Sequence, residues 1–466
     1  MALIALFYFL TIRDGHIWGD DFALFILHAK NIAQGTPYAE TAYLYNPAYS
    51  DIGPKTAPPV YPVLLAPVYR VAGLDLKAMK AEECVFLIAG LACVGLLLSY
   101  LLPLPYALAV VALLAFNPFS TRIKDLILTD VPFFFFCYLV VWLVTRAEAT
   151  GRPLSGLLLG ILIYAAYGTR VFGMALLGAL IVAWFLRRLI PSKTVIVAAS
   201  VALVLTLAQT LWLPGVLTYK NQLKQKDSGI TLHHLIINLT AVEWELRNDI
   251  FAAGNSSILS WALLGFLLLL GAVGFVLRAR KGLTFFDWFF LFYLAGVLIL
   301  PPTEDPRYLY PFLPAWLFYV CVAVLAVPRP QPRTALAAFT GVMLTASCAS
   351  GYHASFFKPV PEGIADPAFQ SVVRYLSANA QPGANFVFLK PRLLGLLTGH
   401  STAAVDPATD FAEMKQYLAQ IRAAYVITTH DWLEDEQHWL GFTSANPGVL
   451  EKAFELQGFT VYRVTQ

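Results

Sequence analysis

Trp18-Gly19-Asp20-Asp21-Phe22 is the stretch around which the rest of the chain is interpreted. It belongs to a polar loop, residues 13–83, which is the longest polar interruption in an otherwise apolar first 350 residues. The loop places two adjacent carboxylates just beyond the first apolar run. Carboxylates beside a membrane are costly unless water, a cation or a substrate meets them. We therefore expect the chemistry of the protein to involve this loop.

The composition is that of a membrane protein. Of the 466 residues, 58% are hydrophobic and only 13% are charged, and the mean hydropathy is +0.65. Apolar runs separated by short charged loops are typical of a polytopic helical membrane protein and exclude an ordinary soluble globular chain. The five cysteines all fall within apolar runs, so no disulfide framework is expected.

We predict about 11 transmembrane helices. The apolar runs lie at residues 1–18, 84–102, 104–120, 129–145, 154–169, 171–186, 194–214, 257–277, 284–300, 308–327 and 334–350. The opening stretch, residues 1–12, has no basic start and no small-residue cleavage site, so a cleavable signal peptide is not expected. It is also short for a span, which leaves two alternatives: the span continues through Trp18, or the N-terminus is truncated.

The basic residues predict the orientation in the membrane. If every counted run is a span, four basic loops share one side, which is then the cytoplasmic side. This side carries Arg146, Arg152, Arg187, Arg188, Lys193, Arg278, Arg280, Lys281, Arg329 and Arg333. The N-terminus is then cytoplasmic, and loops 13–83, 121–128 and 215–256, the turn 301–307 and the C-terminal tail lie outside.

Two domains are expected: a transmembrane domain at residues 1–350, including its long outer loops, and a small extracytoplasmic α/β domain at residues 351–466. In the tail, Asp366 can cap a helix that starts at Pro367. Short β-rich runs follow at Asn385–Leu389, Ala424–Thr429 and Phe459–Val464. Nothing in the tail looks catalytic. His430 and His438 flank an acidic helix, which is either a solvated face or a metal site.

Three acidic residues are candidates for a catalytic role. Asp20 and Asp21 precede an amphipathic helical run, so they either cap that helix or form a functional acidic pair. Two carboxylates exceed what a cap needs. Asp130, before Pro132 and a run of phenylalanines, is either the N-cap of its helix or a second acid at the same outer membrane level, with Asp125 behind it.

Basic groups are expected at that same outer level. They are Lys55, Arg170 and Arg307, each close to the end of an apolar run. Lipid headgroups are one partner for any single one of them. Several such groups beside carboxylates suggest instead a bound phosphate that takes part in the reaction.

These residues together resemble the GT-C glycosyltransferases. The acidic pair followed by a helix and Asn31-Ile32-Ala33-Gln34-Gly35 is similar to the first outer loop of that family. The branch it most resembles is the bacterial dolichyl-phosphate-mannose protein mannosyltransferase-like one, which includes the lipid A aminoarabinose transferases. Further similar motifs are Lys55 ahead of Pro58-Pro59, Thr129-Asp130-Val131-Pro132, Thr169-Arg170, Arg307-Tyr308-Leu309-Tyr310-Pro311 and, in the tail, Lys390-Pro391-Arg392-Leu393-Leu394.

The resemblance implies an integral membrane, inverting glycosyltransferase. It would move a hexosyl or pentosyl group from a polyprenyl-phosphate carrier to a hydroxyl or phosphate of a lipid, glycan or protein on the non-cytoplasmic face. Asp20 would be the catalytic base, with Asp21 and Asp130 assisting. The lipid phosphate would be bound by Lys55, Arg170, Arg307 and Tyr308.

The resemblance also bears on cofactors, partners and location. No cofactor is required, although a divalent cation, Mg²⁺ or Mn²⁺, could be held at Asp20 and Asp130. The partners are the lipid-linked donor, the acceptor and membrane lipids, with no nucleic acid. The expected location is the bacterial inner membrane, with the tail periplasmic or extracellular. A transporter or flippase of a lipid-linked sugar is the alternative, and the sequence names neither the sugar, the acceptor nor the prenyl chain.

Overall fold

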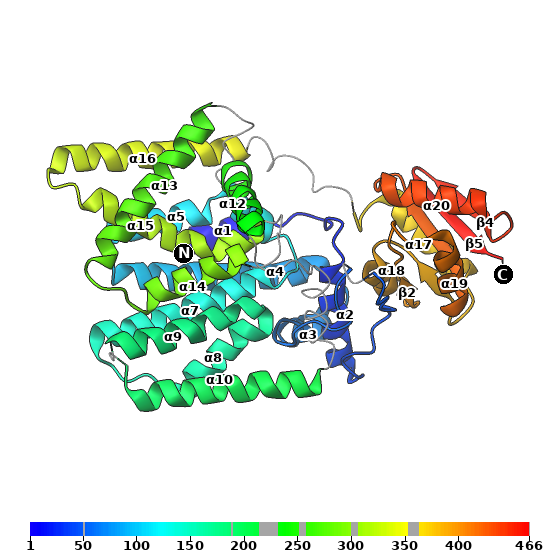
Figure 1. Ribbon diagram of the computed structural model, residues 1–466, viewed down its shortest axis with the longest axis horizontal. Coiled ribbons are helices and arrows are strands. Elements are labelled where there is room, and N and C mark those ends of the chain that lie inside the picture. The colour runs from blue at the N-terminus through cyan, green and yellow to red at the C-terminus, as the bar shows by residue number, and fades with distance from the viewer. Residues whose placement is uncertain are drawn as a thin grey trace. The chain divides into compact units, whose positions relative to one another are not determined.

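Helices form over every predicted apolar run. The computed structural model describes residues 1–49, 52–187, 190–213, 232–250, 258–299, 306–352 and 363–465 (Figure 1). The predicted features at Arg188, at the turn 301–305 and in most of loop 215–256 lie outside these residues. The helices of the first 351 residues are α1 (Ala2–Leu10), α2 (Asp21–Gln34), α3 (Val60–Ala72), α4 (Leu76–Ser99), α5 (Leu104–Ala115), α6 (Pro118–Ile123), α7 (Asp130–Thr150), α8 (Gly156–Thr169), η2 (Val171–Gly173), α9 (Met174–Arg187), α10 (Ser192–Trp212), α12 (Leu232–Glu245), η4 (Leu246–Ile250), α13 (Ile258–Ala279), α14 (Phe285–Ile299), η5 (Pro306–Phe312), α15 (Leu313–Leu325) and α16 (Pro330–Gly351).

The chain divides into two compact units by its internal contacts. The first, here called the helical unit, comprises Met1–Ile12, Lys80–Gln209 and Ser228–Pro359. The second, the loop–tail unit, comprises Arg13–Met79, Thr210–Asp227 and Val360–Gln466. The first outer loop, which we placed with the transmembrane domain, therefore groups mostly with the tail.

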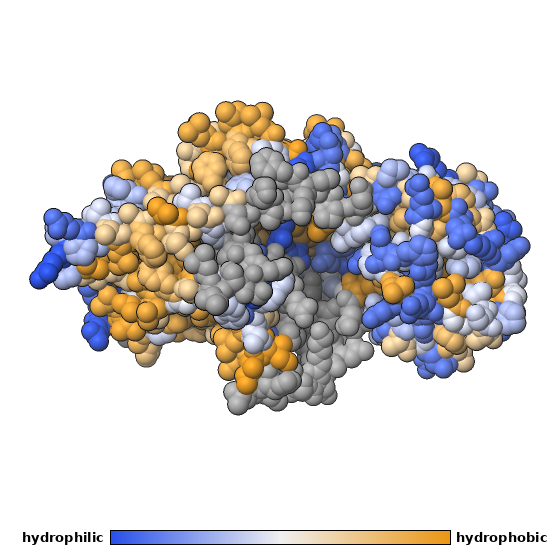
Figure 2. Space-filling model, turned by 90° about the horizontal axis from the view of Figure 1, so that it is seen from above, coloured by the Kyte–Doolittle hydropathy of each residue, from blue (hydrophilic) through white to orange (hydrophobic). Residues whose placement is uncertain are grey.

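The helical unit is a multi-pass membrane domain. Among the described residues, five helices that lie wholly or mostly in this unit are long and apolar enough to cross a membrane. They are Leu76–Ser99, Asp130–Thr150, Ser192–Trp212, Ser260–Ala279 and Arg307–Leu325. The count of 11 spans stays a prediction. Helix α13 packs on α15, α14 on α9 and α7 on α8. A Cβ at Gly274 of α13 would collide with the Tyr319 carbonyl of α15, so a glycine allows these two backbones to approach closely. Figure 2 shows one face of the helical unit, on which hydrophobic side chains predominate.

The tail forms the predicted α/β fold, with a five-stranded sheet in the order β2-β1-β3-β5-β4. The first three strands pair in parallel, and β5 pairs antiparallel with both β3 and β4. Helix α17 begins where predicted, because the Asp366 carboxylate accepts hydrogen bonds from the backbone N–H groups of Ala368 and Phe369. The elements are α17 (Pro367–Asn379), β1 (Asn385–Val387), α18 (Pro391–Thr398), β2 (Thr402–Ala403), α19 (Phe411–Gln420), β3 (Ala423–Thr429), α20 (Leu433–Ala445), β4 (Leu450–Leu456) and β5 (Phe459–Val464).

The first outer loop is joined to the tail by backbone pairing and by aromatic packing. Tyr43 forms a parallel bridge with Thr402 at the β2 edge of the sheet, and Ile17 bridges to Gly363. The indole of Trp18 packs edge-on against Phe369, at 4.9 Å between ring centroids, and it also contacts Phe388, Trp432 and Phe459. Such aromatic contacts contribute beyond the area that they bury. The loop is thus an integral part of the loop–tail unit.

Candidate active site

Asp20 and Asp21 stand at the start of a helix, as predicted. Helix α2 begins at Asp21, and Asp20 is its N-cap residue, but the Asp20 side chain makes no capping hydrogen bond to α2. Its Oδ1 atom instead accepts hydrogen bonds from the backbone N–H groups of Arg392 and Leu393, at 3.0 and 3.1 Å. Asp20 therefore caps the tail helix α18, and the simple interpretation as a cap of its own helix is wrong.

The guanidinium of Arg392 is the centre of this arrangement and is fully buried. Its Nη1 lies 2.9 Å from Oδ1 of Asp21, its Nε lies 3.5 Å from Oδ2 of Asp20, and Nη2 donates to the Pro54 carbonyl at 2.9 Å. It also stacks over the Tyr43 ring, 4.9 Å from its centroid. We call these five residues the Arg392 cluster. Asp20 and Asp21 therefore both contact this one cation.

Burial dominates the electrostatics of Asp20. Removal from water raises the pKa of the Asp20 carboxyl to about 6, although the Arg392 guanidinium and the Leu393 N–H oppose that rise. Asp21 raises the same pKa further, and Lys390 lowers it. A carboxyl with a pKa near 6 is ionised at neutral pH and is still basic enough to accept a proton.

Asp130 organises a second cluster, within the helical unit. It is the first residue of α7 and is buried, and Thr129 takes the N-cap position that the sequence left open for Asp130. Asp130 forms an ion pair with Arg170, and its Oδ2 lies 3.6 Å from Nη1 of Arg307. The Arg170 guanidinium lies 4.3 Å above the centre of the Tyr308 ring. These four residues are here called the Asp130 cluster, and all four were predicted site residues.

Tyrosine hydroxyls hold the segment that carries Arg307. In the short helix η5, the Tyr308 and Pro311 carbonyls accept hydrogen bonds from the hydroxyls of Tyr293 and Tyr138, at 2.8 and 2.6 Å. The Tyr310 hydroxyl lies 2.9 Å from that of Ser120. Buried hydroxyl-to-carbonyl bonds fix the backbone of a short helix that could not hold its shape alone. The position of Arg307 therefore depends on three neighbouring helices.

The remaining predicted residues, Lys55 and Asp125, are members of neither cluster. Lys55 is exposed, and within the described part of the chain it has no hydrogen bond or ion pair. The loop just beyond it is held by His28, whose Nε2 accepts from the Ala57 N–H at 3.1 Å. Asp125 pairs with the fully buried Lys124, whose ammonium also donates to the Thr11 carbonyl, so this acid is part of the packing.

The structure offers no ready metal site in the part of the chain that it describes. There, no group of three or more His, Cys, Asp or Glu side chains could hold a metal ion. Asp20 and Asp130 are each engaged by arginine, which competes with a cation for the carboxylate oxygens. In the tail, His430 forms an ion pair with Glu436. These donors do not fit a divalent ion.

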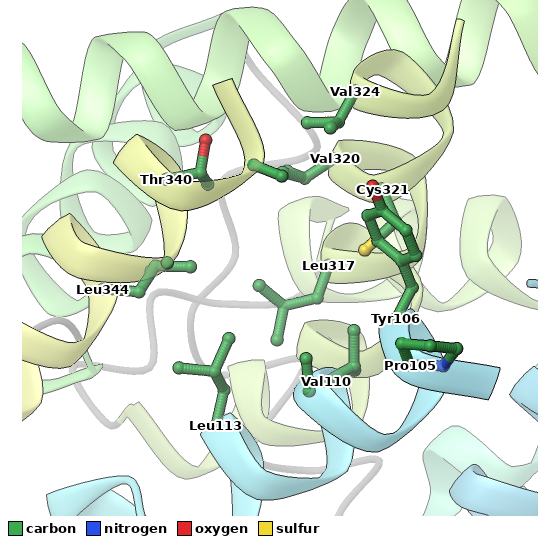
Figure 3. Close-up of a pocket in the computed structure, with 13 residues that line it drawn as sticks. Pro105, Tyr106, Val110, Leu113, Leu317, Val320, Cys321, Val324, Thr340 and Leu344 are labelled. Carbon is green, nitrogen blue, oxygen red and sulfur yellow. The ribbon is translucent and has the colours of Figure 1, made fainter. Parts of the chain in front are cut away.

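An apolar pocket of about 200 Å³ lies among α5, α15 and α16 (Figure 3). Val110 and Leu113 of α5, Leu317 and Val320 of α15, and Leu344 of α16 point into it. It shares no residue with the Asp130 cluster. Any apolar chain fits such a lining, so the pocket does not distinguish a polyprenyl tail from an ordinary membrane lipid.

The fold is that of several solved membrane glycosyltransferases. No family model and no curated protein matches the sequence. The crystal structure of ArnT from Cupriavidus metallidurans, bound to undecaprenyl phosphate, aligns with a TM-score of 0.58 over 99% of this chain and 96% of that chain, at 11% identity. The chain has the GT-C fold.

Other GT-C structures agree with this assignment. The oligosaccharyltransferase AglB from Archaeoglobus fulgidus, in complex with an inhibitory peptide and a dolichol-phosphate, has a TM-score of 0.61 over 92% of this chain and 68% of that one, at 12% identity. Mycobacterial AftD, an arabinofuranosyltransferase, has a TM-score of 0.53 over 100% of this chain and 40% of that one, at 14% identity.

Sequence reasoning missed Arg392 and Tyr43. Arg392 was quoted only as part of a motif of resemblance, in a tail where nothing looked catalytic. One signal was present: an arginine in the first turn of the apolar helix α18 opposes the helix dipole, so it calls for a nearby acid. Tyr43 gave no such signal, because an aromatic residue in a loop has many structural roles.

Proposed function

We propose that the protein is a membrane glycosyltransferase that transfers a sugar from a polyprenyl-phosphate carrier to an acceptor on the non-cytoplasmic face, with inversion at the anomeric carbon. The single observation that carries the proposal is the Asp130 cluster, in which the guanidinium groups of Arg170 and Arg307 come together beside one buried carboxylate. The GT-C fold supports it, because the solved ArnT and AglB structures hold undecaprenyl phosphate and dolichol-phosphate.

In this mechanism Arg170 and Arg307 bind the phosphate of the donor. As the bond between the sugar and the phosphate breaks, negative charge accumulates on the leaving lipid phosphate. Fixed guanidinium groups stabilise that charge more in the transition state than in the ground state. Asp130 orients both arginines, and the Tyr308 ring supports one of them. The exposed Lys55 side chain provides a further positive charge for the donor phosphate.

Asp20 is the proposed general base. The acceptor hydroxyl must lose its proton as its oxygen attacks the anomeric carbon, and a carboxylate within hydrogen-bond reach can take that proton. Attack from the side opposite the phosphate inverts the anomeric centre. Neither step, as proposed, requires a metal ion. A strict need for Mg²⁺ or Mn²⁺ after EDTA treatment would contradict this metal-free mechanism.

The experiment that tests the function uses purified protein and a panel of polyprenyl-phosphate sugars, pentosyl and hexosyl. Release of polyprenyl phosphate, together with a glycosylated product of inverted configuration, is the expected result. Movement of intact donor across a vesicle membrane without release would identify the alternative, a flippase. Release with retained configuration would leave a glycosyltransferase and overturn the inverting mechanism.

The proposed orientation places the tail outside, in the periplasm or extracellular space, and the N-terminus in the cytoplasm of a bacterial cell. Ser192 and Ser444 are both exposed and would lie on opposite sides of the membrane. Single cysteine variants at these positions are expected to react with an impermeant thiol reagent in intact cells only at Ser444→Cys. The five native cysteines are buried or half-buried, which keeps the background low. Equal labelling of both variants would overturn the orientation.

A further inference from the structure

The N-terminus of α18 is capped by a residue from the other end of the chain. Its own N-cap residue, Lys390, makes no side-chain capping bond. The first N–H groups of a helix have no partner within the helix, and a carboxylate that accepts two of them is held in place by both. Asp20 accepts from the second and third residues of α18, Arg392 and Leu393. One carboxylate oxygen, Oδ1, is thereby fixed.

The other carboxylate oxygen of Asp20, Oδ2, is the one that can accept a proton. Oδ2 is buried and has no hydrogen-bond partner among the described residues, and it lies 3.5 Å from Nε of Arg392. That separation is long for a hydrogen bond but short for electrostatic attraction. The two backbone N–H groups therefore orient the carboxylate through Oδ1. Arg392 balances its charge near Oδ2 without a hydrogen bond that would occupy a lone pair of that oxygen.

The surroundings of Arg392 are built to hold its guanidinium in this place. A buried guanidinium is costly unless it is paired and hydrogen-bonded. Nη1 and Nη2 of Arg392 bond to Asp21 and to the Pro54 carbonyl, and the guanidinium lies over the Tyr43 ring. Gly53 makes room for it: a Cβ at Gly53 would lie 2.7 Å from Nη2. The backbone of Gly53 also has φ +101°, which side-chain-bearing residues rarely adopt.

We propose that Arg392, with the first turn of α18, positions Asp20 for proton abstraction, so that the tail is a working part of the active site. This inference rests on the proposed function, in which Asp20 is the base. Arg392 does not touch the reacting atoms in this scheme. It acts through the carboxylate, by fixing its orientation and by balancing its charge.

The charges around Asp20 set the expected pH response. Arg392 of α18 and Lys390, the residue before that helix, favour the ionised carboxylate, and Asp21 of α2 disfavours it. The Tyr43 ring lies against the same guanidinium. Arg392 is the largest of the groups that lower the pKa of Asp20. Without it, burial is opposed less strongly, and the pKa of Asp20 must rise. The base is then protonated, and inactive, at a higher pH than in the unaltered protein.

The test is the pH profile of kcat/KM for Arg392→Gln and Arg392→Met, with Arg374→Met as the matched control. Arg374 is an exposed arginine of the same domain that donates a hydrogen bond to the Ser371 hydroxyl. Loss of an adjacent opposite charge moves a carboxyl pKa by about one unit or more. We expect the acid limb of both Arg392 variants to move up by about that amount, with activity largely recovered above pH 8. In Arg392→Lys the acid limb is expected to lie close to its position in the unaltered protein, because the positive charge is kept. In Arg374→Met the acid limb is expected not to move.

Two results would overturn the inference. In the first, folded Arg392→Gln loses activity equally at every pH, so the residue is only structural. In the second, neither uncharged variant folds, which makes the guanidinium a requirement of the fold. Failure of the proposed function is distinguishable: the unaltered protein would then release no polyprenyl phosphate, or Asp20→Asn would be as active as the unaltered protein. If Asp20→Asn is inactive but the acid limb of Arg392→Gln does not move, the positioning role of Arg392 is wrong and the proposed function still stands.

Discussion

The two charged clusters are opposite in their balance of charge. In the Arg392 cluster two carboxylates share one guanidinium, whereas in the Asp130 cluster two guanidinium groups share one carboxylate. The first lies in the loop–tail unit and the second in the helical unit. The aspartates look equivalent in the sequence, since each stands at the start of a helix beside an apolar run. The two aspartates differ in their partners in the folded structure.

The difference indicates which acid can serve as a base. The Asp130 carboxylate lies beside both Arg170 and Arg307, and its protonation would weaken both interactions. Asp20 is held through Oδ1 and keeps Oδ2 without a hydrogen-bond donor among the described residues. Two guanidinium groups side by side suit a leaving phosphate, and a buried carboxylate with a raised pKa suits the removal of a proton. The following predictions test that division of labour.

The largest effect is expected for Asp20→Asn. The amide keeps the shape and an acceptor for α18 but loses the basicity, and loss of a general base typically costs about 10²- to 10⁴-fold in rate. Turnover should therefore fall by at least about 100-fold, with donor binding largely kept. The control is Asp14→Asn, an exposed acid of the same loop paired with Lys77. Normal turnover of Asp20→Asn beside an inactive Asp130→Asn would move the base to the other cluster.

Arg170→Ala and Arg307→Ala should come next. A lost charge-assisted contact to a phosphate costs about 1.5–3 kcal/mol, which is about 10- to 100-fold in donor affinity. Titration of folded variants with the polyprenyl-phosphate donor measures this. Arg122→Ala, an exposed arginine of the same unit, is the matched control. Unchanged donor affinity in both variants would assign these arginines to lipid headgroups.

A change of pH is expected to act mainly on the Arg392 cluster. The pKa of Asp20 is raised to about 6 by burial, and only the ionised carboxylate accepts a proton. Activity should be fully present well above pH 6 and should fall about tenfold per unit below it, in kcat/KM of the unaltered protein. An acid limb near pH 4, the ordinary range of an exposed aspartate, would show that burial of Asp20 does not persist in the working enzyme.

Gly53→Ala is expected to have a smaller effect, on stability first. The new methyl group meets Nη2 of Arg392 at 2.7 Å, and the backbone at φ +101° is strained for any side chain. Such strain costs about 1–3 kcal/mol, which lowers Tm by several degrees. Gly35→Ala is the matched control, because Gly35 also has a positive φ but nothing lies within 4 Å of its Cβ position. Equal losses in both variants would mean that the contact with Arg392 adds nothing.

Asp21→Asn should have the smallest effect. The Asp21 side chain is 62% exposed, so its ion pair with Arg392 is screened by water. Exposed pairs contribute about 1 kcal/mol or less, so turnover should change by less than about fivefold. Steady-state kinetics beside Asp20→Asn makes the comparison direct. A loss as large as that of Asp20→Asn would mean that the two aspartates act as a unit.

The helices were predictable because their signal is local. Apolar runs, basic loops and the Asp366 cap depend on neighbouring residues alone, and the structure has helices or strands at each predicted place. Strand β4 was missed, because Leu450–Leu456 contains residues that favour helices. It is a strand because a two-residue turn with positive φ at Gln457 and Gly458 returns the chain as β5. A Gln-Gly pair is a weaker turn signal than Asn-Gly.

The candidate site was predictable only in part, for the opposite reason. The acids and arginines were found because charge next to an apolar run is conspicuous in any membrane protein. Their pairing depends on contacts between distant segments, which no local pattern carries. Arg392 lies hundreds of residues from Asp20, and a single arginine in a tail resembles many others. Local sequence therefore identified which residue types matter but not which of them meet.

The bridge between Tyr43 and Thr402 has a consequence for how the protein is made. A chain is synthesised from its N-terminus, so the loop that carries Trp18, Asp20 and Tyr43 emerges before α4 to α16, and α18 and β2 emerge after them. Until then the loop has neither the sheet edge that it joins nor the helix that it caps. The loop must wait through the insertion of the whole helical unit, and a chain that stops short of Pro391 would never acquire the arrangement of Asp20 on which the proposed reaction depends.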